Sequence, residues 1–187
     1  MSSWYKKSQK QQIIDHPIKI IQLPERRQGT NYSCGAAAVQ SVLAYYGIDI
    51  RESELKEALN TNPETGTDEQ DIVNLAKKFG FHSFMKSLSI RKVIEYIEQD
   101  VPVILLIQAW ADKPTDYSKT RDFPHFVVAV GYSSKGLYFE DPSLIFNGFL
   151  SFQELESRWR GSDSDHLGIV IFGKKPEYKE NKAEHIE

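Results

Sequence analysis

The sequence predicts an α+β domain in which an N-terminal helical half packs on a C-terminal antiparallel β-sheet. Apolar residues recur at helical spacing through the first half, whereas the second half holds continuous apolar runs joined by hairpin-length connections. The chain has 187 residues, of which 40% are hydrophobic, enough for one domain with a sizeable core. We therefore expect a single domain over residues 13–173, with a flexible N-terminus at 1–12 and a flexible charged tail at 174–187.

Four helices are expected in the first half, each with a residue typical of a helix end. They cover residues 34–46, 52–60, 67–79 and 89–97. Gly47 and Gly80 follow the first and third helices, as glycine commonly does at a helix C-terminus. The stretch from Thr67 to Gln70 resembles a capping box, with Thr67 as the N-cap, and Ser89 is the expected N-cap of the fourth helix.

The second half is expected to form strands at residues 102–108, 126–132, 137–140 and 166–174. The first of these is apolar throughout, which is typical of a buried central strand. Ser133 to Gly136 separates the second and third strands as a hairpin connection. A capping box at Ser151 opens a short helix that reaches Trp159. Between Gln108 and Pro124 lies a long polar loop, and loops of that length are often functional.

The composition excludes several classes of protein. A net charge of −3 and a pI near 6.0, without a basic stripe, argue against nucleic acid as a partner. The longest apolar run, residues 101–107, is too short to span a bilayer, so we expect no integral membrane segment. The first residues lack the apolar core of a signal peptide, which favours a cytoplasmic protein or one exported without a visible signal.

Cys34 is the only cysteine, which excludes an internal disulfide and a cysteine-based zinc site. We expect neither a metal nor another cofactor, since no histidine–carboxylate cluster has ligand spacing. Cys34 stands where the first helix should begin. Unpaired backbone N–H groups and the positive end of the helix dipole favour thiolate there, so a cysteine nucleophile is expected at this position. A lone cysteine is otherwise most often a small buried hydrophobe.

A cysteine nucleophile requires a base and a residue that orients the base, and His125 and Asp141 are the candidates. His125 opens the strand after the long loop, and Asp141 ends the partner strand of the hairpin. A three-residue loop would pair Val127 with Asp141 and put both side chains on one face. A two- or four-residue loop would separate them unless a bulge intervenes, for which Gly136 is a candidate.

The tetrahedral oxyanion formed during acyl transfer needs hydrogen-bond donors. Gln28 carries a side-chain amide six residues before Cys34. The backbone N–H of Cys34 at the helix start is a second candidate. Trp110, in the long loop, either packs beneath that loop or lines a substrate groove, and we favour packing.

Taken together, Gln28, Cys34-Gly35, the strand from His125 to Gly131 and Asp141-Pro142 resemble the peptidase C39 family of papain-like cysteine proteases. The resemblance covers roughly residues 17–173. It implies the papain-like fold, with Cys34 as nucleophile, His125 as base, Asp141 as orienter and Gln28 as oxyanion donor. Transporter-linked members usually carry Asp before the cysteine, where this chain has Ser33, so stand-alone C39-like proteins are the closer resemblance.

The resemblance implies a cysteine peptidase that acts on a peptide or protein substrate. We expect an extended peptide in a groove between the helical and sheet halves, bordered by the loop at 108–124, which is a candidate lid. Two alternatives remain open. The same residues could hydrolyse a non-peptide amide or pass the acyl group to an acceptor other than water, or the chain could be a catalytically silent peptide-binding adaptor.

Overall fold

One seven-stranded antiparallel sheet forms the centre of the computed structural model, which describes residues 16–161 and 164–176. The strand order is β2-β7-β3-β4-β5-β6, and β1 pairs with β4 beyond the end of β3. The strands are β1 (Lys19–Ile20), β2 (His82–Ser87), β3 (Val103–Gln108), β4 (Pro124–Tyr132), β5 (Gly136–Glu140), β6 (Gly148–Ser151) and β7 (Leu167–Phe172).

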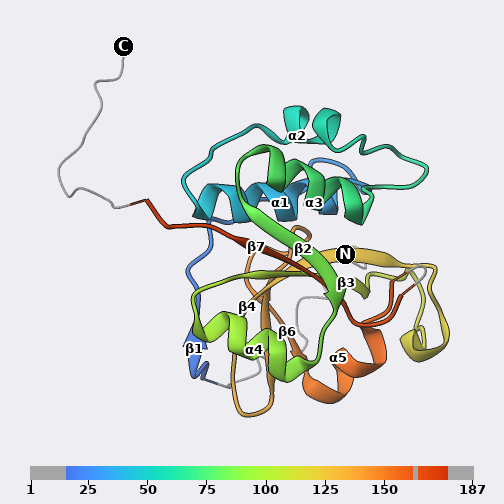
Figure 1. Ribbon diagram of the computed structural model, residues 1–187. Helices are drawn as coiled ribbons and strands as arrows, with labels where there is room; N and C mark the ends of the chain where they lie inside the picture. Colours follow the sequence, from blue (N-terminus) through green and yellow to red (C-terminus); the bar gives the residue numbers. More distant parts are fainter. Residues whose placement is uncertain (1–15, 162–163, 177–187) are drawn as a thin grey trace.

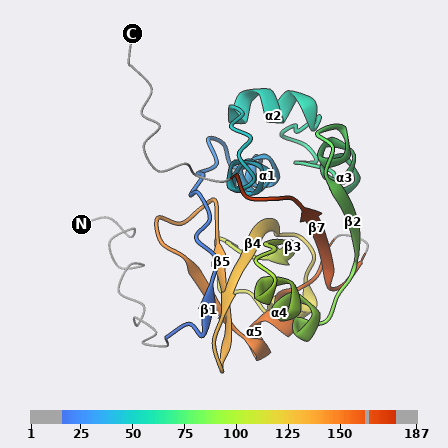
Figure 2. The same ribbon diagram turned by 60° about the vertical axis from the view of Figure 1, so that its left-hand side comes forward.

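Helices cover both faces of this sheet. Helices α1 to α3 lie on one side, and α4 and α5 lie on the other, as the views in Figures 1 and 2 both show. The helices are α1 (Cys34–Tyr45), α2 (Glu52–Ala58), α3 (Glu69–Lys78), α4 (Ile90–Glu98) and α5 (Phe152–Arg158). A 3₁₀ helix, η2 (Tyr117–Lys119), lies in the connection between β3 and β4.

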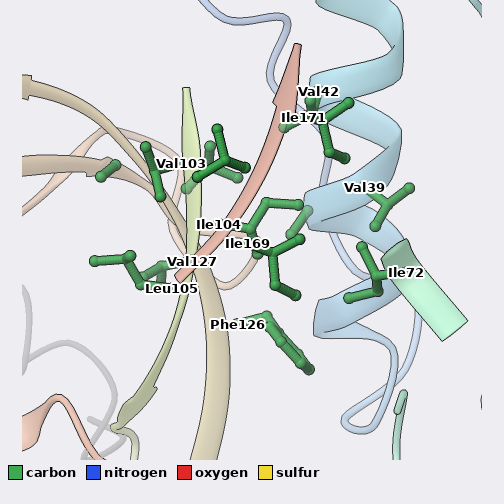
Figure 3. Packing of buried hydrophobic residues seen from close by; sticks show 14 of the residues in the cluster. Val39, Val42, Ile72, Val103, Ile104, Leu105, Phe126, Val127, Ile169 and Ile171 are labelled. Atoms are coloured by element: carbon green, nitrogen blue, oxygen red, sulfur yellow. The ribbon is translucent and has the colours of Figure 1, made fainter. Parts of the chain in front are cut away.

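The main core lies between α1 and the middle of the sheet (Figure 3). Val42 of α1 lies next to Ile171 of β7, Val39 lies on the side of α1 near Ile72 of α3, and every residue of β3 is buried. The side chains at the start of α1 are small and apolar, and Ala36, Ala37 and Ala38 are fully buried against neighbouring elements. Close packing at the start of α1 matters for function, since it fixes the position of Cys34.

The four helices of the first half are confirmed, but one predicted cap is wrong. Asp68 rather than Thr67 is the N-cap of α3, because its carboxylate accepts the Gln70 N–H at 2.7 Å. The Thr67 hydroxyl instead lies 2.8 Å from that of Thr61. Ser89 caps α4 as predicted, and the capping box at Ser151 is present at the start of α5.

Three strands of the sheet, namely β1, β2 and β6, are not predicted from the sequence. Strand β2 lies between α3 and α4 in the chain and pairs with β7 at the edge of the sheet. As a result α4 lies on the face opposite α1 (Figure 2), so the helices do not form one block packed on a separate sheet. The predicted helices-then-strands order is therefore wrong for β1 and β2, although the α+β class and the antiparallel sheet are confirmed.

The β4–β5 hairpin reaches the predicted register by a different route. Three residues, Ser133 to Lys135, separate β4 from β5 as expected, but Tyr132 pairs with Leu137 and not with Gly136. A register shift between Ala129 and Gly131 then moves the pairing by one residue, so that Val128 faces Glu140. The bulge therefore lies at Val130 and not at Gly136, and it restores the pairing that places His125 and Asp141 on one face.

The predicted flexible segment 1–12 and most of the predicted tail 174–187 lie outside the described residues. Within residues 16–161 and 164–176, none of the helices combines the length and apolar character that crossing a bilayer requires.

Candidate active site

Cys34 is the first residue of α1, and its surroundings bring backbone N–H groups to its sulfur. Ser33, the N-cap, has its hydroxyl turned toward Thr30, so it does not cap the helix with its side chain. The N–H groups of Gly35 and Phe126 donate to Cys34 Sγ. A Cβ at Gly35 would lie 2.6 Å from Thr67 Cβ, so glycine permits this close approach of the helix start to its neighbours.

His125 and Asp141 form a buried hydrogen-bonded pair beside Cys34. His125 Nε2 lies 2.7 Å from Asp141 Oδ1, and both side chains are only 7% exposed. The Cys34 side chain is hydrogen-bonded to the His125 ring. Because Nε2 faces Asp141, Nδ1 is the ring nitrogen that remains for the thiol. The structure thus brings together three of the four predicted site residues in one chain of contacts.

The electrostatics of this cluster favour charge separation between sulfur and imidazole. Burial opposes ionisation of Cys34, but hydrogen bonds and charge from His125, with the two N–H donors, hold the thiol pKa below its ordinary value. Burial also opposes the imidazolium, yet the hydrogen bonds from Asp141 and Cys34 outweigh it and raise the pKa of His125 to about 9. Opposite shifts of this kind stabilise a thiolate–imidazolium pair near neutral pH.

Asp141 is held at both carboxylate oxygens. The Ser143 N–H donates to Oδ1 at 2.8 Å, and the Trp110 indole N–H donates to Oδ2 at 3.2 Å. The Trp110 ring also meets the His125 ring edge to face, with centroids 6.4 Å apart. Packing beneath the loop was the favoured interpretation of Trp110, but the side chain is 54% exposed and contacts the site. No sequence motif identified this residue, and only its place in the long loop singled it out.

Gln28 lies next to the Asp141 turn. Its backbone N–H donates to the Pro142 carbonyl at 3.1 Å, and its Oε1 accepts from the Ser143 hydroxyl. The side-chain Nε2 donates one hydrogen to the Thr30 carbonyl at 2.8 Å. Thr30 also bonds Ser33, the residue before the cysteine, so Gln28 is tied to both the Cys34 turn and the Asp141 turn.

The loop between β3 and β4 is anchored at several points. Gln108 Oε1 accepts the Phe123 N–H at 2.8 Å and thereby closes the base of the loop. The Tyr117 hydroxyl accepts the Ala111 N–H, and Arg158 of α5 lies over the Tyr117 ring. These contacts give the loop a defined path past His125. The lid function predicted for it stays a prediction.

A cleft of about 790 Å³ opens beside Cys34 between the helical side and the sheet, where the substrate groove was predicted. One wall comes from the turn before α1 and from residues 63–69, and the other from side chains of the sheet. The lining residues from the sheet and its loops are Met85, Leu106, Asp122, Pro124, Phe126, Ser164 and Leu167. The cleft is thus continuous with the sulfur of Cys34 and borders the end of the long loop.

Glu140, the neighbour of Asp141, points to the opposite face of β5 and is buried. Its Oε1 accepts the Arg26 backbone N–H at 3.2 Å, and the Ser41 hydroxyl also interacts with this carboxyl. Burial raises the pKa of this carboxyl to about 7. Across the described residues, no group of three or more His, Cys, Asp and Glu side chains is arranged to hold a metal ion.

Comparisons with known proteins agree with this geometry. A family model described as "Peptidase_C39 like family" matches residues 20–164, a range that contains Gln28, Cys34, His125 and Asp141. A search of curated proteins gives no match to this sequence.

Solved structures show the same fold at low sequence identity. The peptidase domain of Streptococcus ComA, a bi-functional ABC transporter, superposes with a TM-score of 0.64 at 24% identity over 82% of this chain and 99% of its own. A double glycine motif protease from an AMS/PCAT transporter, in complex with its leader peptide, gives 0.63 at 18% identity over 86% and 98%. A C39-like peptidase of Bacillus anthracis gives 0.66 at 16% identity over 86% and 100%. The fold is therefore the papain-like fold of C39 peptidase domains.

Proposed function

This chain belongs to the Peptidase_C39 like family, and from that membership we propose that it is a cysteine peptidase acting through a Cys34 thioester. The observation that carries the proposal is the chain of contacts from the Cys34 thiol through His125 to Asp141. The three residues come from α1, β4 and the end of β5, which are far apart in sequence. A purely structural cysteine needs neither the histidine nor the carboxylate.

In the proposed acylation step, the Cys34 thiolate attacks the carbonyl carbon of the scissile amide. A C–S bond forms and the carbonyl oxygen becomes an oxyanion. His125, as the imidazolium, then gives its proton to the amide nitrogen, the C–N bond breaks, and the amine leaves. Asp141 holds the imidazole orientation and stabilises its positive charge.

Deacylation reverses the roles with water as the nucleophile. Neutral His125 removes a proton from water, the hydroxyl attacks the thioester carbonyl, and the C–S bond breaks to regenerate the thiolate–imidazolium pair. The Cys34 backbone N–H and the second amide hydrogen of Gln28 are the proposed oxyanion donors. Loss of one such donor typically costs on the order of 100-fold to 1,000-fold in rate.

We also propose a direction for the bound peptide. The leaving amine has to meet His125, and the cleft beside Cys34 is lined by Cys34 but not by His125. In this proposal the cleft takes the acyl part of the substrate, and the leaving part lies on the side of His125 and Trp110. The leader peptide bound to the solved double glycine protease supports a peptide as the substrate class here.

The test is the pH dependence of Cys34 alkylation by iodoacetamide in wild type, His125→Ala and a control, His82→Ala. His82 is an exposed histidine of β2 and does not contact the site. We expect rapid labelling well below pH 8 in wild type and His82→Ala. His125→Ala should label slowly until the pH approaches an ordinary thiol pKa of about 8.5.

Equal and slow labelling of all three proteins would contradict the proposal and leave the peptide-binding adaptor as the better account. With a reactive thiol established, a peptide library identifies the substrate. The acyl group trapped on Cys34 by rapid quenching and identified by mass spectrometry then distinguishes a peptidase from a hydrolase or acyltransferase of other amides.

A further inference from the structure

Trp110 connects an exposed loop to the most buried polar pair in the site. Its indole N–H donates to Asp141 Oδ2 at 3.2 Å. Its ring and the His125 imidazole lie edge to face, at an interplanar angle of 87°. The side chain is nevertheless 54% exposed. A tryptophan that serves only packing is usually buried, as Trp159 is here at 0% exposure, with its indole N–H on the Leu167 carbonyl.

The backbone at Trp110 also has an unusual conformation. Its φ is +61°, in the left-handed region that bulky residues rarely adopt. The flanking residues hold this conformation, because the Ala109 N–H donates to the Phe123 carbonyl and the Ala111 N–H donates to the Tyr117 hydroxyl. Non-glycine residues in this region persist where the surrounding structure fixes them, often at functional sites. The loop thus turns the indole onto Asp141.

The carboxylate of Asp141 needs a partner at each oxygen to keep one orientation. Oδ1 accepts both from His125 and from the Ser143 N–H. Because both of these bonds hold Oδ1, they alone do not prevent a rotation of the carboxylate that moves Oδ2. The Trp110 bond to Oδ2 holds the second oxygen, and the ring, in edge-to-face contact with the His125 imidazole, is placed to keep water from the hydrogen bond between Asp141 and His125. Both effects strengthen the attraction between imidazolium and carboxylate.

We propose that Trp110 is a positioning residue for the proposed catalytic reaction, holding Asp141 through its indole N–H and shielding the His125–Asp141 pair with its ring. This inference rests on the proposed function. Trp110 acts through Asp141 and takes no proton itself. Its loss should therefore weaken the imidazolium without removing the thiol or the base.

The experiment compares alkylation of Cys34 by iodoacetate, an anion, with alkylation by neutral iodoacetamide, from pH 5 to 10. Iodoacetate is attracted by a neighbouring imidazolium, so its rate falls when His125 loses its proton. Iodoacetamide reports the thiolate alone. The ratio of the two rates therefore measures the imidazolium directly and requires no substrate. The variants are Trp110→Phe, which keeps a ring without the N–H, and Trp110→Ala, which removes both.

We expect wild type to lose its preference for iodoacetate near pH 9, where His125 deprotonates. Trp110→Phe should move the pH at which this preference is lost to a lower value by about one unit or more, the effect of one lost hydrogen bond to a charged group. Trp110→Ala should move it further, because water then screens the pair. Ser118→Ala is the control from the same loop, since it removes the hydrogen bond from the Ser118 hydroxyl to Asp116 and leaves the partners of Trp110 and Asp141 in place.

The outcomes separate this inference from the proposed function. If both Trp110 variants only lower the melting temperature and keep the wild-type fall in iodoacetate preference, the positioning role is wrong. An equal shift in Ser118→Ala would likewise overturn it, because the loop as a whole and not the indole would then be responsible. If wild type shows no preference for iodoacetate at any pH, the proposed function itself fails.

Discussion

Among the residues that the structure describes, two histidines each contact a carboxylate through Nε2, but in different surroundings. His125 Nε2 lies 2.7 Å from Asp141 Oδ1, and His166 Nε2 lies 3.2 Å from Glu156 Oε2. The first pair is 7% exposed at each side chain, whereas the second is 34% and 52% exposed. Contact between a histidine and a carboxylate therefore does not by itself distinguish a candidate catalytic pair from a surface ion pair.

The two pairs differ in the additional groups that contact them. His125 is hydrogen-bonded to the Cys34 thiol on its other side, and Asp141 accepts further hydrogen bonds from Ser143 and Trp110. The His166 ring instead stacks on Trp159, with centroids 5.0 Å apart. Burial strengthens the electrostatic attraction between His125 and Asp141, whereas solvent weakens the attraction between His166 and Glu156. We consequently expect a large effect when the carboxylate of the first pair is replaced and a small one when that of the second pair is replaced.

The largest difference is expected when each carboxylate is neutralised. Both oxygens of Asp141 accept from N–H groups, so in Asp141→Asn the amide NH₂ must face a donor. We expect the rate of Cys34 alkylation by iodoacetate at pH 7 to fall on the order of 100-fold or more, in line with the loss of about 10⁴ in serine-based triads. Glu156→Gln, the matched change in the exposed pair, should leave that rate unchanged.

The measurement is a pH–rate profile of both variants, with circular dichroism to establish that each is folded. A folded Asp141→Asn protein with wild-type iodoacetate reactivity would remove Asp141 from the proposed site. A loss of similar size in Glu156→Gln would show that the comparison between the two pairs has no functional meaning.

Much of the site could be predicted from the sequence because each residue lies at the end of an element. Cys34 begins a helix, His125 is near the start of a strand, and Asp141 follows the next strand. Such ends are recognisable from apolar periodicity and turn residues. The order of these three residues, with Gln28 before them, then carried the resemblance to the family.

The remaining features depend on tertiary structure that periodicity does not encode. The bulge at Val130 arises where β1 replaces β3 as the neighbour of β4, with Ile20 opposite Gly131, a contact between distant segments. Four of the six residues of β2 are exposed, so its sequence resembles a polar connection. The contact of Trp110 with Asp141 could not be predicted, because it depends on a left-handed backbone that no local signal requires of tryptophan.

A second prediction concerns Glu140, a buried carboxyl group next to Asp141 in the sequence. It extends the comparison to a buried carboxyl group that is not paired with a histidine. Its pKa is raised from 4.5 to about 7 in the folded protein, so folding binds a proton there. The charged form destabilises the folded state, and this penalty grows as the pH rises from about 4.5 to about 7. Glu140→Gln should therefore stabilise the protein at pH 8 by about 1–3 kcal/mol.

Urea unfolding of wild type and Glu140→Gln at pH 4.5 and pH 8 tests this expectation. The two proteins should have similar stability at the lower pH, because the wild-type carboxyl is then neutral in the folded state. The Gln Oε1 still accepts the Arg26 N–H, so this contact is preserved. Equal stability at pH 8, or a variant that is less stable there, would show that the buried carboxylate is compensated.

The smallest effect is expected at the exposed pair, in the stability of Glu156→Gln. Solvent and salt screen an ion pair at this exposure, so its removal should cost less than about 1 kcal/mol. Urea unfolding at pH 6 should show that small cost at low ionic strength and almost none at about 1 M NaCl, where the Debye length is about 3 Å. Asp141→Asn should destabilise the protein at both salt concentrations, since its partners are buried. If Glu156→Gln instead costs more than 2 kcal/mol regardless of salt, exposure does not separate the two pairs, and the additional groups that contact them must alone explain their difference.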